Sequence, residues 1–172
     1  GDNGDAEFPD NFSWAWFREA QMKFLELPNT GVANTIDLGD VKNNHPSDKA
    51  PIGRRLALLA ARDVNRQNVV AEGPRFKGMA VDGSVVTVSF ENAEGLRTTD
   101  GKAPAQFWLA GQDQKWLRAA AEIRGQTVVL SADGLTQPVA VRYAFAAFPD
   151  VNLVNGAGLP AYPFRSDTWK RK

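Results

Sequence analysis

The pattern of apolar and polar positions changes character near Glu72. Before that residue, apolar side chains recur at helical spacing over residues 10–26 and again over residues 52–64, with the three-to-four-residue period of an amphipathic helix. After it, apolar and polar side chains alternate, as in residues 84–90, which is the period of a half-buried strand. The change predicts helices in the first part of the chain and β-structure in the rest.

The first part, residues 10–67, is predicted to form a helix, a strand and a second helix. Pro28 and Gly31 end the first helix, and the short apolar run 32–38 is typical of a buried strand. The second helix has one apolar face, made up of Ile52, Leu56, Leu59, Ala60 and Val64. A parallel strand needs neighbouring strands and helices on both faces. We therefore expect residues 10–67 to be the last part of a larger α/β domain.

The second part carries a series of short strand candidates, at residues 84–90, 106–110, 115–123, 126–130 and 139–144. Asp-Gly and Arg-Gly pairs, which favour tight turns, separate most of them. Short strands at this spacing predict an antiparallel β-sandwich. The expected fold class is thus α/β plus β, with the α/β portion over residues 1–70 and the sandwich over residues 71–172.

Composition removes several classes of function. Lys plus Arg equals Asp plus Glu at 20 each, so no basic patch points to nucleic acid. Cysteine is absent, which excludes disulfides and thiol chemistry. Because the chain has one histidine and no cysteine, a metal site is improbable. No apolar run approaches the ~18 residues of a membrane span. Residues 1–5 do not have the pattern of a signal peptide. A processed chain would have lost such a peptide.

His45 is the candidate catalytic residue. It is the one histidine, and it comes after the predicted strand 32–38, where α/β enzymes gather their ligands. Its imidazole can act as a base near neutral pH without strong perturbation. Asp40 and Asp37 are candidates to orient that imidazole and stabilise its charged form, as the third member of a triad does. The plainer alternative is that His45 is an ordinary surface or core residue.

The sequence supplies a base and an acid but no recognisable nucleophile. It contains neither a Gly-x-Ser-x-Gly elbow nor a Gly-Asp-Ser motif. The glycines near residue 156 do not open a helix after a strand, so a dinucleotide loop is not supported and no cofactor is expected.

A series of short motifs, taken together, resembles a known family. They occupy residues 18–21, 27–31, 37–40, 45–46, 53–58, 141–144, 152–153, 158–161 and 163–165, with Lys49. These motifs extend over nearly the whole chain and follow one another in the order found in a known family. Together they resemble the C-terminal part of the sialate O-acetylesterase family of SGNH hydrolases. The resemblance implies the end of an SGNH-type α/β/α domain and, after it, a β-sandwich domain. It also implies a serine esterase that removes O-acetyl groups from sugars in the periplasm or outside the cell.

The same resemblance assigns roles to residues. His45 matches the catalytic histidine of the family, and the acid maps to Asp40 or Asp37. Lys42 stands where many related esterases place aspartate, so the acid is not aligned uniquely. The family's serine and oxyanion-hole residues lie in an upstream half. The implied partners are an N-terminal fragment or subunit that carries the serine, and an acetylated saccharide.

Three explanations of the absent serine stay open: a cleaved protein, a subunit of a split enzyme, and a piece with another task. The need of strand 32–38 for neighbours favours the first two. The rival class of function is a carbohydrate-binding module, in which Trp108, Trp116 and Trp169 would stack on sugars, or a structural domain that braces a partner.

Overall fold

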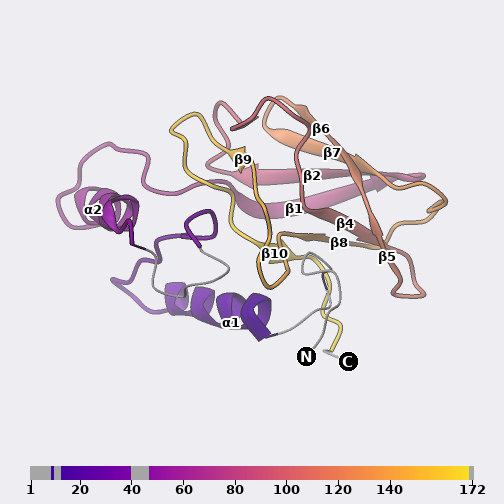
Figure 1. The fold of residues 1–172 in the computed structure, drawn as a ribbon, viewed down its shortest axis with the longest axis horizontal. Coiled ribbons are helices and arrows are strands. Elements are labelled where there is room, and N and C mark those ends of the chain that lie inside the picture. Colours follow the sequence, from indigo (N-terminus) through magenta and orange to yellow (C-terminus); the bar gives the residue numbers. More distant parts are fainter. Residues whose placement is uncertain (1–8, 10–12, 40–46, 171–172) are drawn as a thin grey trace.

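Two antiparallel sheets make up most of the molecule (Figure 1). The computed structural model describes residues 9, 13–39 and 47–170. The first sheet has the order β1-β2-β7-β6 and contains β1 (Arg75–Asp82), β2 (Val85–Glu91), β7 (Thr127–Ser131) and β6 (Ala120–Arg124). The second has the order β10-β8-β4-β5 and contains β10 (Phe164–Arg165), β8 (Ala140–Tyr143), β4 (Phe107–Ala110) and β5 (Trp116–Arg118). A small pair joins β3 (Arg97–Thr98) to β9 (Leu153–Val154).

The core lies between the two sheets. Alternate residues of the strands point into it, namely Val86, Val88, Phe90, Val128 and Leu130 from the first sheet and Phe107, Leu109, Val141 and Tyr143 from the second. Burial of each such side chain contributes roughly 1.5–3 kcal/mol. The antiparallel β-structure predicted from the period-two pattern is therefore confirmed.

The second sheet is covered on its outer face as well, which is why β4 and β8 are buried at every position. Trp108, Ala110 and Ala140 face outward and pack with Trp116 and Trp169. The C-terminal segment thus acts as a third layer over this sheet.

Arg142, in the middle of β8, carries a buried charge beneath that layer. Its Nε and Nη2 donate to the two carboxylate oxygens of Asp167, at 2.8 and 2.9 Å. Its guanidinium lies 4.4 Å from the ring centroid of Trp116 and 5.1 Å from that of Phe145. A charge this deeply buried is tolerated only because an opposite charge and polarisable rings surround it.

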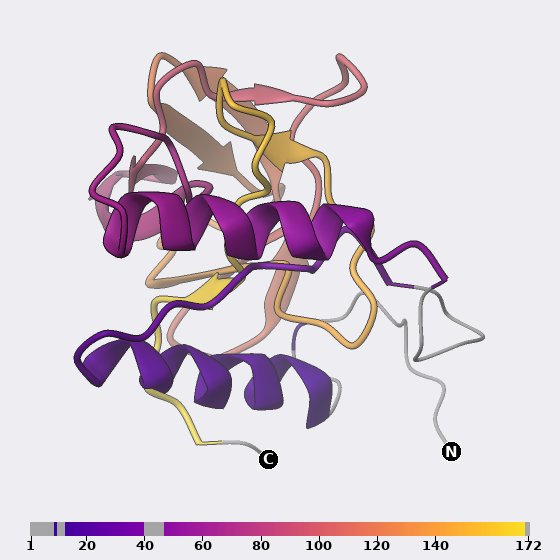
Figure 2. The ribbon, with the colours of Figure 1, turned by 90° about the vertical axis from the view of Figure 1, so that its left-hand side faces the viewer.

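Both helices, α1 (Ser13–Met22) and α2 (Ala50–Asp63), lie on one side of the sandwich. Figure 2 shows the segment after α1 running between them. Charged contacts attach both helices: Glu19 of α1 pairs with Arg165 at 2.7 Å, and Arg62 of α2 pairs with the buried Glu72 at 2.6 Å. Each helix is thus attached by an ion pair.

The structure of this chain alone does not contain the strand expected over residues 32–38. The backbone is extended over residues 31–35 but pairs with no strand, and it turns at Ile36–Leu38, where the amide of Leu38 donates to the carbonyl of Thr35. A strand exists only beside a neighbour, and among the described residues all strand pairs are antiparallel and lie in the sandwich. The α/β layer and the domain boundary at residue 70 stay predictions.

The helices also differ from expectation. Within the part expected to be helical over residues 10–26, the α-helix ends at Met22 and tightens into a 3-10 turn, η1 (Lys23–Glu26). On α2 only part of the apolar face predicted from spacing is buried: Leu59 is buried and so is the polar Arg55, whereas Leu56 is 52% and Val64 is 74% exposed. The buried edge of this helix faces the segment after α1, since Leu59 packs against Gly31 and Arg55 binds Asn34 and Asp37.

The strand expected over residues 115–123 is two strands in different sheets. The chain crosses from the second sheet to the first at Ala119, whose amide donates to the carbonyl of Phe107. The two-residue strands β3, β9 and β10 were not predicted, because such short pairings leave almost no periodic pattern. The eight-residue strand β1 was not predicted either, and its burial does not alternate from residue to residue.

Arg142→Met should destabilise the protein by about 3–5 kcal/mol, because the buried Asp167 loses its two-pronged partner and keeps only the longer ion pair with Arg165, at 3.4 Å. The measurement is urea-induced unfolding detected by tryptophan fluorescence. The exposed pair Arg124–Glu122 provides a matched control, and Arg124→Met should change the free energy of unfolding by less than about 1 kcal/mol. Equal effects of the two substitutions would contradict this account.

Acid should weaken the same buried pair. Burial alone would raise the pKa of Asp167, but the hydrogen bonds and charge of Arg142 outweigh it and hold this pKa below its usual value. A lowered pKa gives stability that is present above the unfolded-state pKa of about 3.9 and is lost as pH falls through the folded-state pKa. The stability difference between wild type and Asp167→Asn should therefore be constant from pH 6 to 8 and shrink below about pH 4. A difference independent of pH down to 2 would count against the pair.

Candidate functional site

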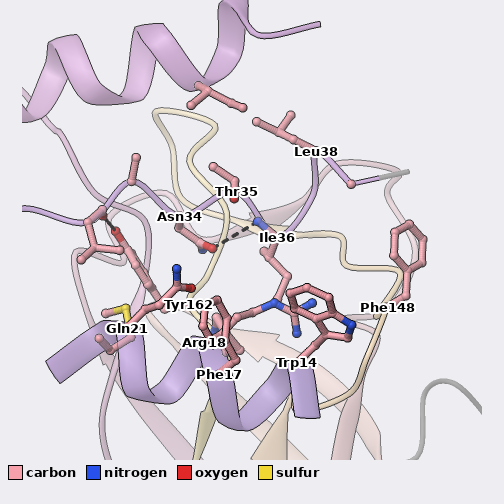
Figure 3. A pocket seen from close by; sticks show the side chains of 16 residues that line it. Trp14, Phe17, Arg18, Gln21, Asn34, Thr35, Ile36, Leu38, Phe148 and Tyr162 are labelled. Atoms are coloured by element: carbon pink, nitrogen blue, oxygen red, sulfur yellow. Dashed lines mark hydrogen bonds between the residues drawn. The ribbon is translucent and has the colours of Figure 1, made fainter. Parts of the chain in front are cut away.

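A groove of about 280 Å³ lies between α1, residues 32–39 and the loop after β8 (Figure 3). Its lining is mostly apolar and comprises Trp14, Phe17, Arg18, Gln21, Met22, Val32, Ala33, Asn34, Thr35, Ile36, Leu38, Gly39, Ile52, Phe148, Tyr162 and Pro163. The groove therefore runs along the extended segment that the sequence identified as a strand.

Arg18 fixes the wall of the groove that α1 provides. Its Nη1 and Nη2 donate to the carbonyls of Ala146 and Ala147, both at 2.7 Å. Burial lowers the pKa of this guanidinium from its ordinary value, although arginine stays charged at physiological pH. Arg18 thus holds α1 against the loop that bears Phe148.

The opposite wall, residues 32–36, is held by side chains. Tyr162 donates its hydroxyl to the carbonyl of Val32 at 2.8 Å, and burial raises the pKa of this phenol to about 12, so it stays a donor at neutral pH. The side-chain amide of Asn34 donates to the carbonyls of Pro160 and Ala161, both at 3.1 Å. These contacts replace the bonds that a neighbouring strand would supply.

Asp37, one of the two candidate acids, forms a two-pronged ion pair with Arg55 of α2. Nη1 of Arg55 lies 2.6 Å from Oδ1 of Asp37, and Nη2 lies 2.6 Å from Oδ2. The same Nη1 donates to the main-chain carbonyl of Asn34 at 2.5 Å. Arg55 is 9% exposed, so solvent screens this pair only weakly.

His45 and Asp40 lie outside the described residues. Gly39, the last residue described before them, lines the groove. A Cβ at Gly39 would come within 2.9 Å of the Phe148 ring, so the ring packs directly on this backbone. The groove therefore includes the last described residues before His45 in the sequence.

The tryptophans considered for sugar stacking do not offer open faces. Trp108 and Trp116 are each 6% exposed and belong to the outer layer of the second sheet. The half-buried Trp169 packs on Trp116, with ring centroids 5.5 Å apart. Stacking on a sugar ring needs an accessible aromatic face, so this arrangement does not favour the carbohydrate-binding module.

Large apolar side chains are exposed on the two helices and the turn after α1. Trp14 and Phe17 of α1, Phe24 of η1 and Leu56 of α2 are each more than half exposed. Between these helices, the amides of Val32, Ala33 and Thr35 find no acceptor among the described residues. Unpaired extended backbone flanked by exposed apolar helices is typical of a surface that another polypeptide segment covers.

Metal-binding clusters and membrane spans are two further features that could define a function. Among residues 9, 13–39 and 47–170, no three His, Asp or Glu side chains gather in a way that could hold a metal ion. Nor does any helix of those residues combine the length and apolar character needed to cross a membrane.

Arg55, Arg18 and Tyr162 shape the groove, yet sequence reasoning did not single them out. Arg55 occupies a polar position next to the apolar stripe of its helix, and Tyr162 lies in an irregular loop. The partners of Arg55 and Tyr162 are 18 and 130 residues away in sequence, so no local pattern marks them. One usable signal was the resemblance motif over residues 53–58, which includes Arg55.

No protein-family model matches the chain, and no curated protein matches it either. Among solved structures, it is similar to a carbohydrate acetylesterase from Xanthomonas citri, at 39% identity and a TM-score of 0.90. That alignment covers 98% of this chain. This chain spans 38% of the other one.

The unpaired amides should exchange quickly in this chain alone. Hydrogen–deuterium exchange measured by mass spectrometry should label residues 32–35 within minutes, because few of their amides have an acceptor, while β2 should stay protected as the internal control. A polypeptide that covers this surface should slow exchange over residues 32–35. Strong protection of these residues in the isolated chain would show that nothing further needs to cover them.

Proposed function

We propose that this chain is the C-terminal part of a carbohydrate O-acetylesterase of the sialate O-acetylesterase type, with an SGNH serine-esterase mechanism. One observation carries the proposal: nearly the whole chain matches a carbohydrate acetylesterase at 39% identity and a TM-score of 0.90. The motifs at residues 37–40, 45–46 and 158–165 support the narrower assignment to this type.

In the proposed mechanism His45 is the general base. It takes the proton of a serine hydroxyl as the serine oxygen attacks the acetyl carbonyl, and it returns that proton to the departing sugar oxygen. Water then attacks the acetyl-serine with the same assistance and releases acetate. Asp40 or Asp37 holds the imidazole in the required tautomer. Base catalysis of this kind contributes roughly 10²–10⁴-fold.

The serine and the oxyanion hole are proposed to come from an N-terminal half, either a fragment of the same protein or a separate subunit. Two features support this. This chain spans 38% of the esterase that it matches, and its two helices leave apolar side chains exposed beside an unpaired extended segment. A parallel strand added along residues 32–36 would pair those amides and cover both helices.

The proposed substrate class is an acetylated saccharide, and the proposed location is the periplasm or the extracellular space. The carbohydrate acetylesterase that nearly the whole chain matches supports this substrate class. Which sugar is deacetylated depends on residues that the N-terminal half contributes.

His45→Ala in the full-length enzyme should abolish release of acetate from 4-nitrophenyl acetate and from acetylated sugars, and leave folding intact. Asp40→Asn should reduce the rate less than His45→Ala does, because a misoriented imidazole still reaches the serine at times. Acetate release and near-ultraviolet circular dichroism are the two measurements. A His45→Ala enzyme with near wild-type turnover would place the base elsewhere, and greater damage from Asp37→Asn would move the acid to that residue.

The pH profile provides a separate prediction. Turnover should rise with an apparent pKa of about 6–7, because the serine proton can leave only when His45 is neutral. A carboxylate beside the imidazole raises its pKa and burial lowers it, so the two effects offset each other. Initial rates between pH 5 and 9, corrected for spontaneous ester hydrolysis, are the test. A flat profile over that range would remove His45 as the base that controls the rate.

A further inference from the structure

Three of the polar side chains that line the groove are already bonded to the main chain of this protein. Arg18 donates to two carbonyls through both of its Nη atoms, and Tyr162 donates its hydroxyl to a third. Asn34 uses both ends of its side-chain amide: it donates to two carbonyls and accepts from the main-chain amide of Ile36 at 3.3 Å (Figure 3). These side chains therefore offer few free donors and acceptors to a ligand.

A saccharide is a poor occupant of such a groove. Each hydroxyl of a sugar ring needs a hydrogen-bond partner when it leaves water, and an unpaired hydroxyl weakens binding. The other polar groups of the lining belong to Trp14, Gln21 and Thr35, and all three residues are exposed. Groups that water already reaches gain little when a sugar hydroxyl replaces that water. The rest of the lining is apolar, which favours an apolar group as the occupant.

Large apolar side chains at the rim of the groove remain in contact with water. Trp14 and Phe17 of α1 are each more than half exposed, and their rings meet edge to face with centroids 5.8 Å apart. From α2, Ile52 belongs to the lining, and Leu56, one turn further along that helix, is also more than half exposed. Figure 2 shows α1 and α2 on either side of the segment after α1, so apolar side chains flank this segment on both sides.

We propose that this groove is a docking pocket for an apolar side chain of the N-terminal half of the protein, and that it is not the pocket for the sugar. This inference rests on the proposed function, which supplies that half. An engineered cavity of about 150 Å³ holds a benzene ring, so a groove of about 280 Å³ has room for one or two such side chains. The amides of Val32, Ala33 and Thr35 belong to the same lining, have no acceptor among the described residues, and are available to bind the backbone of that half.

The N-terminal half fits this face better than other occupants do. This chain spans 38% of the carbohydrate acetylesterase that it matches, so most of the length of such an enzyme lies outside it. A polypeptide brings both carbonyls for the open amides and apolar side chains for the groove. A second copy of this chain fits less well, because the carbonyls of Val32 and Asn34 in its own extended segment are already bonded to side chains.

Photo-crosslinking in the full-length protein identifies the occupant. With 4-benzoylphenylalanine in place of Phe17, light should join this residue to a peptide of the N-terminal half, which mass spectrometry identifies. The same amino acid in place of Val81, an exposed residue of β1, is the control and should give no such product. A crosslink from position 17 to a second copy of this chain, or no crosslink to protein at all, would overturn the inference.

Stability and substrate affinity distinguish a docking pocket from a sugar pocket. Phe17→Ser removes the ring while helix propensity stays nearly the same. It should lower the thermal midpoint of the full-length protein by about 2–4 °C and leave KM for an acetylated saccharide within about twofold. The control Val81→Thr keeps a β-branched side chain and should shift the midpoint by about 1 °C or less. An unchanged midpoint in Phe17→Ser with KM raised about tenfold would make the groove the sugar site.

The crosslink keeps this inference distinguishable from the proposed function. If the wild-type protein releases no acetate from any acetyl ester, the esterase function fails, whereas the crosslink and the thermal midpoint still decide what occupies the groove. If acetate is released but position 17 crosslinks to no part of the N-terminal half, the docking pocket is wrong and the esterase function stands.

Discussion

Every main-chain polar group that leaves water needs a hydrogen-bond partner, and this constraint shapes the region around residues 32–38. In the sandwich, strand pairing satisfies it. Between α1 and α2, side chains take over: Tyr162 binds the carbonyl of Val32, and Arg55 binds the carbonyl of Asn34. Several amides of the segment are left without an acceptor among the described residues. The groove and the exposed helices result from this incomplete pairing.

The sandwich provides the rigid support for that region. Its core is closed on both faces of the second sheet, and the buried Arg142–Asp167 pair ties the C-terminal segment to β8. From this platform, Glu19–Arg165 and Arg62–Glu72 hold the two helices. Charged and polar contacts therefore help to place the N-terminal part, together with Ile36 on the core and the ring of Trp16 against Phe145, whereas apolar burial dominates inside the sandwich. Such an arrangement keeps apolar helix surface free for another segment.

The contrast between the complete sandwich and the incomplete region around the two helices also bears on the proposed chemistry. Gly39, the last described residue before the proposed base His45, lies on the incomplete side. The complete side has no open aromatic face for a sugar among Trp108, Trp116 and Trp169. The esterase mechanism accordingly depends on residues that another half would bring to the incomplete side. The two candidate acids differ in kind, because Asp37 already has a buried cationic partner.

The sequence by itself determined the change from helical to alternating periodicity near Glu72, the antiparallel character of the strands beyond that residue, and the candidates His45, Asp40 and Asp37. These are local or compositional properties, which a period or a residue type records. Tertiary structure decided the rest. It split residues 115–123 between two sheets, buried Arg55 in place of Leu56, and gave Asp37 a partner 18 residues away. Such outcomes depend on which distant surfaces meet, and no local pattern encodes that.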